Sequence, residues 1–261
     1  MAKKKRVPFS LTQKIIIILC LIVFFGSGAY LADYLLDNFR AQDNMKKISV
    51  AKEKGIEEVY DSNNDLVGWI KVDGTRIDYP VMQTKDNPEF YLRKDFHKNY
   101  SLAGTPFMDA ASNVAGSPQS DGAESTCNWL IYGHHMKTGI MFYDLLKYDE
   151  ESFYKEHNTF EFSTVQMDKD TGNVRESRGT YQIIAACYSR IYTETSREFK
   201  FYQYASFTSE GDFEDYIAGI KAESVYDTGE TAEYGDQLVT LSTCAYHVDD
   251  GRFYVVGRKI K

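Results

Sequence analysis

Apolar residues in the second part of the chain follow the short runs and alternations that β-strands produce, with turn-forming residues between them. Two such runs, LVGWIK and IDYPVM, flank the pair Asp73-Gly74, which is a strong hairpin signal. Further strands are predicted in TPFMDA, CNWLIYGHH, TFEFSTV, TYQIIAACYSRIY, QLVTLSTCAY and RFYVVGRKI. The polar segment MDKDTGNVRESRG is interpreted as a turn. Many strands with few helices favour a mainly β fold, either a closed barrel or a sandwich.

Helical spacing of apolar residues occurs in two places. In EGDFEDYIAGIKAES it predicts an amphipathic helix before the last two strands, with an apolar face formed by Phe213, Tyr216, Ile217 and Ile220. Residues 33–61 combine helical spacing with many charges, and we interpret them as a stem that lifts the domain off a membrane. The Gly-, Ser- and Pro-containing residues 112–126 are typical of a loop. Residues 62–261 are then expected to form one domain.

The N-terminal region has the pattern of a membrane anchor. Residues 1–14 carry five basic side chains and no acidic one, and residues 15–32 are an 18-residue stretch without a charge. As a helix, this stretch spans roughly 27 Å, just enough for the hydrocarbon core of a bilayer. Basic residues stay on the cytoplasmic side, so we expect a single-pass signal anchor with its N-terminus inside and the domain outside. The alternative is a cleaved secretory signal, although such signals usually have a shorter apolar core of about 7–15 residues.

The charge balance excludes one class of partner. The chain has a formal net charge of −8, and subtracting the +5 of residues 1–32 leaves −13 on residues 33–261. Binding to nucleic-acid phosphates needs clustered Lys and Arg, so a nucleic-acid partner is not expected. Outside the apolar stretch the chain has three cysteines, Cys127, Cys187 and Cys244. Because that number is odd, at least one thiol is free or pairs with another molecule, and the chain is not a disulfide scaffold.

Cys244 is the candidate nucleophile. It ends an apolar strand in TLSTC, and Arg252 begins the next strand. In an antiparallel pair joined by a short loop, Arg252 can return level with Cys244. A thiolate attacking a carbonyl needs a base or cationic neighbour and donors for the oxyanion, which an arginine can supply without losing its charge. The alternative is that Cys244 is a buried structural thiol and that Arg252 forms a surface ion pair with Asp249 or Asp250.

Five histidines are candidates for the base. His97 and His157 lie in charged segments and are expected to be surface residues. His247 is near Cys244 in sequence, but neighbours in a loop need not face each other. His134 follows NWLIYG and therefore stands at a strand end, while strand alternation points His135 the other way. His134 is the preferred partner, and His247 remains the alternative.

No metal or cofactor is expected. The adjacent pair of histidines lacks a third ligand at a plausible spacing. The segment DKDTG, which starts at Asp168, superficially resembles a calcium loop, but Gly179 stands at position 12 where such loops carry a glutamate. We interpret DKDTG as a hairpin turn.

These residues together resemble one family, the class B sortases. The matching segments are TLSTC with Arg252 opening GRFYVVGRKI, IYGHHMKTGIMF, GWIKVDGTRIDYPVMQ and DNPEFYL, and the resemblance covers about residues 60–261. It implies an eight-stranded sortase-type β-barrel with an N-terminal helical addition. It also implies cysteine transpeptidation at the cell surface of Gram-positive bacteria. In that family pattern Cys244 is the nucleophile, His134 the general acid/base and Arg252 the group that stabilises the substrate and the oxyanion.

The resemblance also implies substrate-binding residues. Asn87 and Leu92 match the region that lines the peptide groove in class B, and Tyr202 matches a groove tyrosine. Ser242, two residues before the nucleophile, could bond the peptide backbone. Each has an ordinary structural alternative: Leu92 in the core, Ser242 in a strand ladder, and Tyr202 as one of 20 tyrosines.

The implied reaction is cleavage of a C-terminal sorting motif of a secreted protein after threonine, through a thioacyl enzyme. The acyl group then passes to an amine of a peptidoglycan precursor or of a pilin. Polymerisation of pilins and a non-catalytic wall-binding domain remain alternatives. A cysteine peptidase of the wall-hydrolase kind is disfavoured, because those enzymes usually place the cysteine at a helix N-terminus, whereas Cys244 ends a strand.

Overall fold

Eight strands close into a single barrel in the computed structural model, which describes residues 9–261 except 118, 121, 123 and 169. The strand order around the barrel is β1-β2-β3-β4-β7-β8-β6-β5. The strands are β1 (Leu66–Lys71), β2 (Asp78–Met82), β3 (Phe107–Met108), β4 (Asn128–Tyr132), β5 (Thr159–Met167), β6 (Val174–Arg190), β7 (Leu238–Cys244) and β8 (Gly251–Lys259). The predicted mainly β fold is confirmed, and of the two predicted arrangements the chain forms the closed barrel.

Most neighbouring strands pair antiparallel, but two pairs are parallel: β2 with β3, and β4 with β7. The pairing of β4 with β7 joins segments far apart in the sequence, and the Thr240 hydroxyl donates to the Asn128 side chain across 112 residues. Large buried aromatic side chains fill the barrel, among them Trp129, Phe162 and Tyr181, whose rings are neighbours. Both parallel pairs bring strand ends to one end of the barrel.

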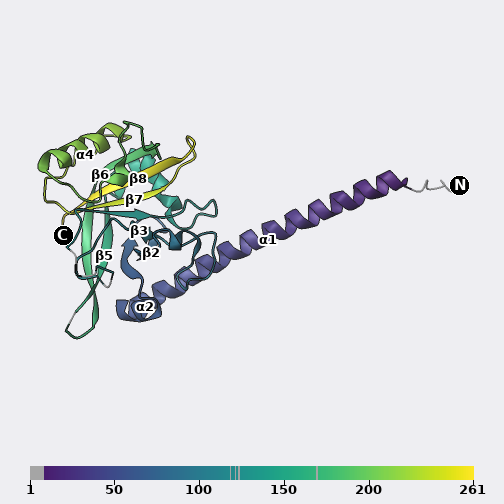
Figure 1. Cartoon of the computed structure of the whole chain (residues 1–261), viewed down its shortest axis with the longest axis horizontal. Coiled ribbons are helices and arrows are strands. Elements are labelled where there is room, and N and C mark those ends of the chain that lie inside the picture. Colours follow the sequence, from purple (N-terminus) through teal and green to yellow (C-terminus); the bar gives the residue numbers. More distant parts are fainter. Residues whose placement is uncertain (1–8, 118, 121, 123, 169) are drawn as a thin grey trace.

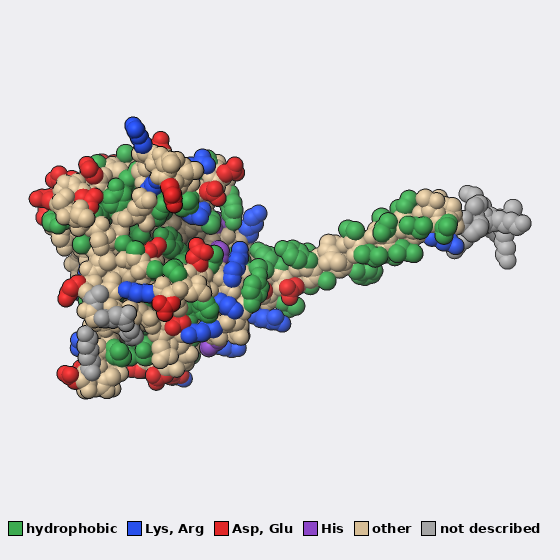
Figure 2. Space-filling model, viewed as in Figure 1, with side chains coloured by type: hydrophobic (Ala, Val, Ile, Leu, Met, Phe, Trp, Pro, Cys, Tyr) green, Lys and Arg blue, Asp and Glu red, His purple; other side chains and the backbone are tan. Residues whose placement is uncertain are grey.

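The helices are α1 (Leu11–Lys54), α2 (Ile56–Ser62), α3 (Glu151–Glu156) and α4 (Glu210–Glu223), with short 3-10 turns η1 (Phe90–Arg93), η2 (Phe142–Asp149) and η3 (Phe201–Gln203). The predicted anchor and the stem as far as Lys54 form one unbroken helix, α1, which projects from the barrel (Figure 1), and the rest of the predicted stem lies in α2. Within the described residues α1 is the one helix that is long and apolar enough to cross a membrane. Apolar side chains cover much of the face of its projecting part that is seen in Figure 2. Most of the basic tail, residues 1–8, lies outside the described residues.

The last turns of α1 pack on the barrel through one face. Asn38, Ala41, Met45 and Ile48 are buried there, at the three- and four-residue spacing of a helix face. Gly55 separates α1 from α2. The stem is therefore part of the domain's core rather than a loose tether.

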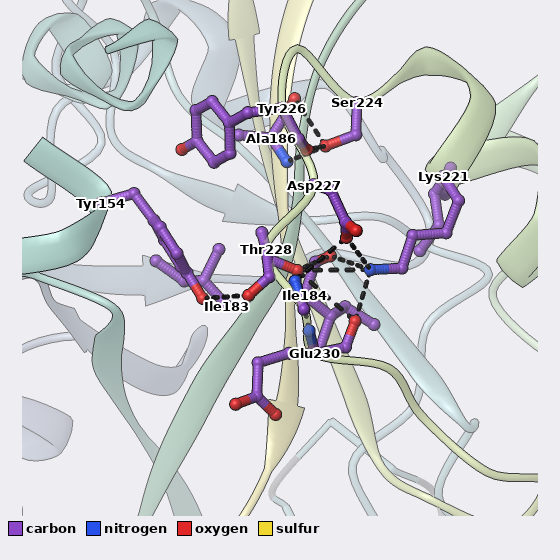
Figure 3. Close-up of polar contacts among 12 residues, drawn as sticks. Tyr154, Ile183, Ile184, Ala186, Lys221, Ser224, Tyr226, Asp227, Thr228 and Glu230 are labelled. Carbon is purple, nitrogen blue, oxygen red and sulfur yellow. Dashed lines mark hydrogen bonds and ion pairs between the residues drawn. The ribbon is translucent and has the colours of Figure 1, made fainter. Parts of the chain in front are cut away.

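The helix predicted from EGDFEDYIAGIKAES is α4, and it covers β6 and β8 through Phe213, Tyr216 and Ile220. The predicted buried thiol, Cys187, lies in the same apolar cluster with no exposed surface. The segment after α4 is fastened to β6 by Lys221, whose ammonium donates to the carbonyl of Ile184 at 2.9 Å, the hydroxyl of Thr228 at 3.2 Å and the carbonyl of Glu230 (Figure 3). These contacts hold the long connection between β6 and β7 in place.

The predicted turn MDKDTGNVRESRG is wrong in its extent. Residues 174–179 belong to β6, and their backbone pairs with β5 from Met167↔Val174 to Phe162↔Gly179. The sequence pattern missed them because most of these side chains are polar, while the pairing that defines the strand runs through the backbone. The turn itself is short, and Asp168 Oδ1 accepts from the amides of Asp170 and Thr171.

Candidate active site

A pocket of about 440 Å³ lies at the end of the barrel where β4 and β7 end. Among the residues that line it are Cys244, His134 and Arg252, which come from three different strand ends. A smaller cavity of about 200 Å³ between α1 and β2 contains none of these three. The sequence-predicted residues with reactive side chains are therefore gathered in one place.

The β7–β8 hairpin places Arg252 beside Cys244. The two residues are direct partners in the antiparallel ladder, and the amide of Ala245 donates to the carbonyl of Gly251 at 3.0 Å immediately beyond them. The predicted return of Arg252 to the level of Cys244 is confirmed. Cys244 is partly exposed and forms no disulfide in the described chain, so its thiol is accessible from the pocket.

His134 is positioned by the parallel pairing of β4 with β7. The residue before it, Gly133, donates its amide to the carbonyl of Ser242 at 3.0 Å and accepts from the Thr243 hydroxyl at 2.7 Å. Gly133 also lies so close to the Phe142 ring that a Cβ would approach it to 2.6 Å. His134 is thus tied to the two residues that precede Cys244.

The imidazole of His134 has a defined partner. Its Nε2 lies 2.8 Å from the carbonyl oxygen of Leu92, and because a carbonyl can only accept, Nε2 carries the proton. In the neutral ring Nδ1 is then the acceptor. Gly104 approaches the Leu92 carbonyl with a φ of 60°, and a Cβ there would meet that oxygen at 2.7 Å, so a glycine is required.

The pKa of His134 is lowered from its ordinary value of 6.5. Burial is the main cause, because it disfavours the charged ring. The Leu92 carbonyl raises the pKa in part, whereas the positive charges of Arg93 and Arg252 lower it. The neutral imidazole, which can accept a proton from a thiol, is favoured at neutral pH.

Arg252 is half-buried, and its guanidinium Nη1 donates to the carbonyls of Asp250 at 3.3 Å and Gly251 at 3.0 Å. Among the ion pairs of the described residues, none joins Arg252 to Asp249 or Asp250. Its charge instead acts on the groups of the pocket, since it contributes to the lowered pKa of His134 and offsets part of the raised pKa of Tyr132.

The other histidines do not line this pocket. The His135 ring contacts Tyr143 and Tyr246, at centroid distances of 4.7 and 5.6 Å, and points away from the pocket, as strand alternation predicts. His247 is exposed and packs on Tyr188, with ring centroids 4.6 Å apart. Of the two histidines weighed as partners of Cys244, the pocket contains His134.

No family model matches this chain. Sortase B of Listeria monocytogenes is 33% identical over 201 residues, which cover 76% of this chain and 71% of that protein. Sortase B of Staphylococcus aureus is 31% identical over 201 residues, covering 76% and 72%. The chain belongs to the class B sortases.

Solved sortase B structures agree with this assignment. Sortase B from Bacillus anthracis in complex with AAEK1 superposes with a TM-score of 0.69 at 27% identity, over 87% of this chain and 99% of that one. The Staphylococcus aureus sortase B–substrate complex superposes with a TM-score of 0.68 at 26% identity, over 87% and 99%. The barrel and the N-terminal helix are therefore those of the family, and the chain is a sortase transpeptidase.

Three of the four substrate-binding residues predicted for this sortase lie in the pocket. Leu92, Tyr202 and Ser242 line the pocket. Asn87 does not; it is exposed, and its carbonyl accepts from the Thr84 hydroxyl at 2.7 Å, while its neighbour Pro88 reaches the pocket instead. The hydroxyl of Ser242 is buried and has no hydrogen-bond partner within the described residues.

Among the pocket residues of this sortase that were not predicted, two form a hydrogen-bonded pair. Tyr132 and Asp109 line the pocket, and the Tyr132 hydroxyl donates to Asp109 Oδ2 at 3.1 Å. The pKa of Tyr132 is raised, mainly by burial and then by the charge of Asp109. A sequence signal existed for Tyr132, which stands two residues before His134 and hence on the same face of its strand. No local signal marked Asp109, because only the pairing of β3 with β4 brings it there.

Within the described residues no group of three or more His, Cys, Asp or Glu side chains is arranged to hold a metal ion. The pocket offers a thiol, an imidazole and a guanidinium.

Proposed function

We propose that this sortase cleaves a sorting motif near the C-terminus of secreted proteins after a threonine, and transfers the acyl group to a cell-wall amine. The observation that carries the proposal is the convergence of Cys244, His134 and Arg252 on one pocket. A nucleophile, an acid/base group and an oxyanion donor are the parts that acyl transfer requires.

In the first step, His134 accepts the proton of the Cys244 thiol, and the resulting thiolate attacks the threonine carbonyl of the sorting motif. The carbonyl oxygen becomes an oxyanion, and the guanidinium of Arg252, level with Cys244 in the hairpin, donates to it. The C–N bond then breaks, and the departing amine takes a proton from His134. The products are a thioacyl enzyme and the released C-terminal segment.

In the second step, an amine of the acceptor attacks the thioacyl carbonyl. His134, now neutral, accepts the proton of the amine, and the C–S bond breaks to regenerate the Cys244 thiolate. The lowered pKa of His134 suits the role of proton acceptor in this half-reaction. Because the thioester conserves the activation of the cleaved amide, the transfer needs no external energy source.

The pocket offers contacts for an extended peptide. A buried hydroxyl without a partner costs about 1–3 kcal/mol, and a hydrogen bond from Ser242 to the bound peptide would remove that cost. Leu92 and Tyr202 supply apolar surface to the lining of the pocket. One similar solved structure is a sortase B–substrate complex, which supports a peptide in this pocket. Asn87 is exposed outside this pocket, beside Pro88 of its lining, where a longer peptide would meet it.

We further propose that residues 15–32 of α1 anchor the enzyme in the cytoplasmic membrane, with residues 1–14 inside and the barrel outside. The support is the length and apolar surface of α1 and the basic residues before it. Anchoring keeps the enzyme beside membrane-bound substrates and so raises their effective concentration.

The test is transfer of a sorting-motif peptide to an amine acceptor by the full-length chain. Cys244→Ala should abolish both cleavage and transfer while the melting temperature stays within a few degrees of the parent. Cys187→Ala is the matched control, because Cys187 lies outside the pocket, and it should retain turnover. Normal transfer by a folded Cys244→Ala variant would disprove the proposed chemistry.

A further inference from the structure

The helix α1 first contacts the rest of the domain a few residues after the apolar segment formed by residues 15–32. Tyr34 already packs against the core, the amide of Leu102 donates to Asp37 Oδ2 at 2.8 Å, and the Thr138 hydroxyl donates to Asn38 Oδ1 at 2.7 Å. Asn38 is six residues beyond residue 32, which is about 9 Å along a helix. Because α1 is unbroken from Leu11 to Lys54, the contacting loops lie near the level where the apolar segment ends.

A short series of contacts links this level to the rim of the active site. Lys137 adjoins Thr138, and its ammonium lies 5.8 Å from the centroid of the Tyr246 ring. Tyr246 is two residues beyond Cys244, in the turn between β7 and β8. Figure 1 shows the β7–β8 turn pointing to the side of the barrel from which α1 leaves. The turn and the end of the apolar segment are therefore on the same side of the molecule.

Exposed apolar side chains lie at and beside the tip of this turn. Tyr246 is 70% exposed and Val248 43% exposed, and Ile191, whose amide donates to the Asp250 carbonyl at 3.0 Å, is 38% exposed. We call Tyr246, Val248 and Ile191 the tip patch. Basic side chains gather on the domain beside the point where α1 leaves it (Figure 2).

The composition of the tip patch fits the interface of a lipid bilayer. Tyrosine rings favour the headgroup level, where one edge is apolar and the other wet, and a lysine beside them can extend its ammonium toward phosphates. Asp249 and Asp250 follow in the same turn and are exposed, which opposes entry into the hydrocarbon core. A surface of this kind rests at headgroup level.

We propose that the tip patch, with Lys137 beside it, rests on the phospholipid surface and holds the mouth of the catalytic pocket at headgroup level. This inference rests on the proposed anchoring by α1. The unbroken helix fixes the height of the domain, and the tip patch supplies a second point of contact that prevents rotation away from the membrane. The pocket then opens next to substrates that are themselves tethered to lipid.

The experiment uses the full-length chain in phosphatidylcholine–phosphatidylglycerol vesicles with brominated lipids as fluorescence quenchers. Tyr246→Trp is compared with Tyr234→Trp, a matched control because Tyr234 is also exposed, at 50%, but lies in the connection between α4 and β7. The native Trp69 and Trp129 are buried and common to both variants. We expect bromine atoms high on the acyl chain to quench Tyr246→Trp more than bromine atoms near its end, and to leave Tyr234→Trp unchanged.

Quenching of Tyr246→Trp by aqueous iodide with none by lipid would overturn the proposal, as would stronger quenching by the deep bromine atoms. Hydrogen exchange of the unsubstituted chain is an independent measurement. Amides of residues 246–249 should exchange more slowly in vesicles than in detergent, and those of residues 233–236 at the same rate in both. Equal rates for both segments would also overturn it. Extraction of the chain from vesicles by alkaline carbonate would show instead that the anchoring itself had failed.

Discussion

Replacement of Arg252 separates its proposed role from a merely structural one. The guanidinium donates two hydrogen bonds, to the carbonyls of Asp250 and Gly251. Within the described residues it forms no ion pair with Asp249 or Asp250. Loss of these bonds from a half-buried side chain should reduce the free energy of unfolding by about 1 kcal/mol. Loss of an oxyanion donor should instead reduce turnover on the order of 10²–10³-fold, or about 2.7–4 kcal/mol of transition-state stabilisation. The kinetic effect should therefore far exceed the effect on stability.

The comparison of Arg252→Ala with Arg252→Lys makes this prediction sharper. Lysine keeps the positive charge but lacks the planar fork, so both variants should be severely impaired in transfer. The charge of Arg252 lowers the pKa of His134, so the pKa of His134 should rise in Arg252→Ala and stay nearer the parent value in Arg252→Lys. Arg178→Ala is a matched control, because Arg178 is exposed and pairs with Glu176 far from the pocket.

The assay is the initial rate of peptide transfer at saturating acceptor, with thermal melts for each variant and NMR titration of the His134 ring. Near-parent rates in both folded Arg252 variants would refute the oxyanion role. A fall in rate matched by an equal fall in stability would show that Arg252 acts only by holding the hairpin.

Three further predictions concern the histidines and Lys221. His134→Ala should lose transfer almost completely while His135→Ala retains most of it, and the reverse order in the same rate assay would show that strand alternation had been misread. Burial lowers the pKa of His134 and of His135 in the folded chain, whereas in the unfolded chain both histidines have the ordinary pKa of about 6.5. Below that pH the unfolded chain binds more protons than the folded one, so the free energy of unfolding should decrease as the pH falls. Thermal melts of His134→Gln between pH 7 and pH 5 should show a smaller decrease, and an unchanged slope would contradict the burial argument. Lys221→Met removes three hydrogen bonds of a charged donor and should lower the free energy of unfolding by about 2–3 kcal/mol, or on the order of 5–10 °C in Tm. Its transfer rate should be unchanged. Lys155→Met, the control at an exposed ion pair, should change Tm by less than about 2 °C. A Tm of Lys221→Met equal to that of the parent would show that the cluster in Figure 3 contributes nothing to stability.

The sequence alone determined the features that depend on neighbouring residues. The partnership of Cys244 with Arg252 follows from one hairpin, because the register of two strands joined by a short turn is fixed locally. The strand-end position of His134, the burial of Cys187 and the apolar face of α4 follow from side-chain periodicity for the same reason. The TLSTC segment, Arg252 and the Gly-His segment were also specific enough to indicate the family, which the comparisons then confirmed.

Only the tertiary structure decided which distant segments meet in the pocket. The parallel pairing of β4 with β7 brings His134 to Cys244, and the Leu92 carbonyl, from a 3-10 turn far away in sequence, fixes the tautomer of His134. Closure of the barrel also places Asp109 in the lining of the pocket, while Asn87 lies outside it. No local pattern encodes these contacts, because strand order around a barrel is set by which surfaces are buried together when the sheet closes on itself.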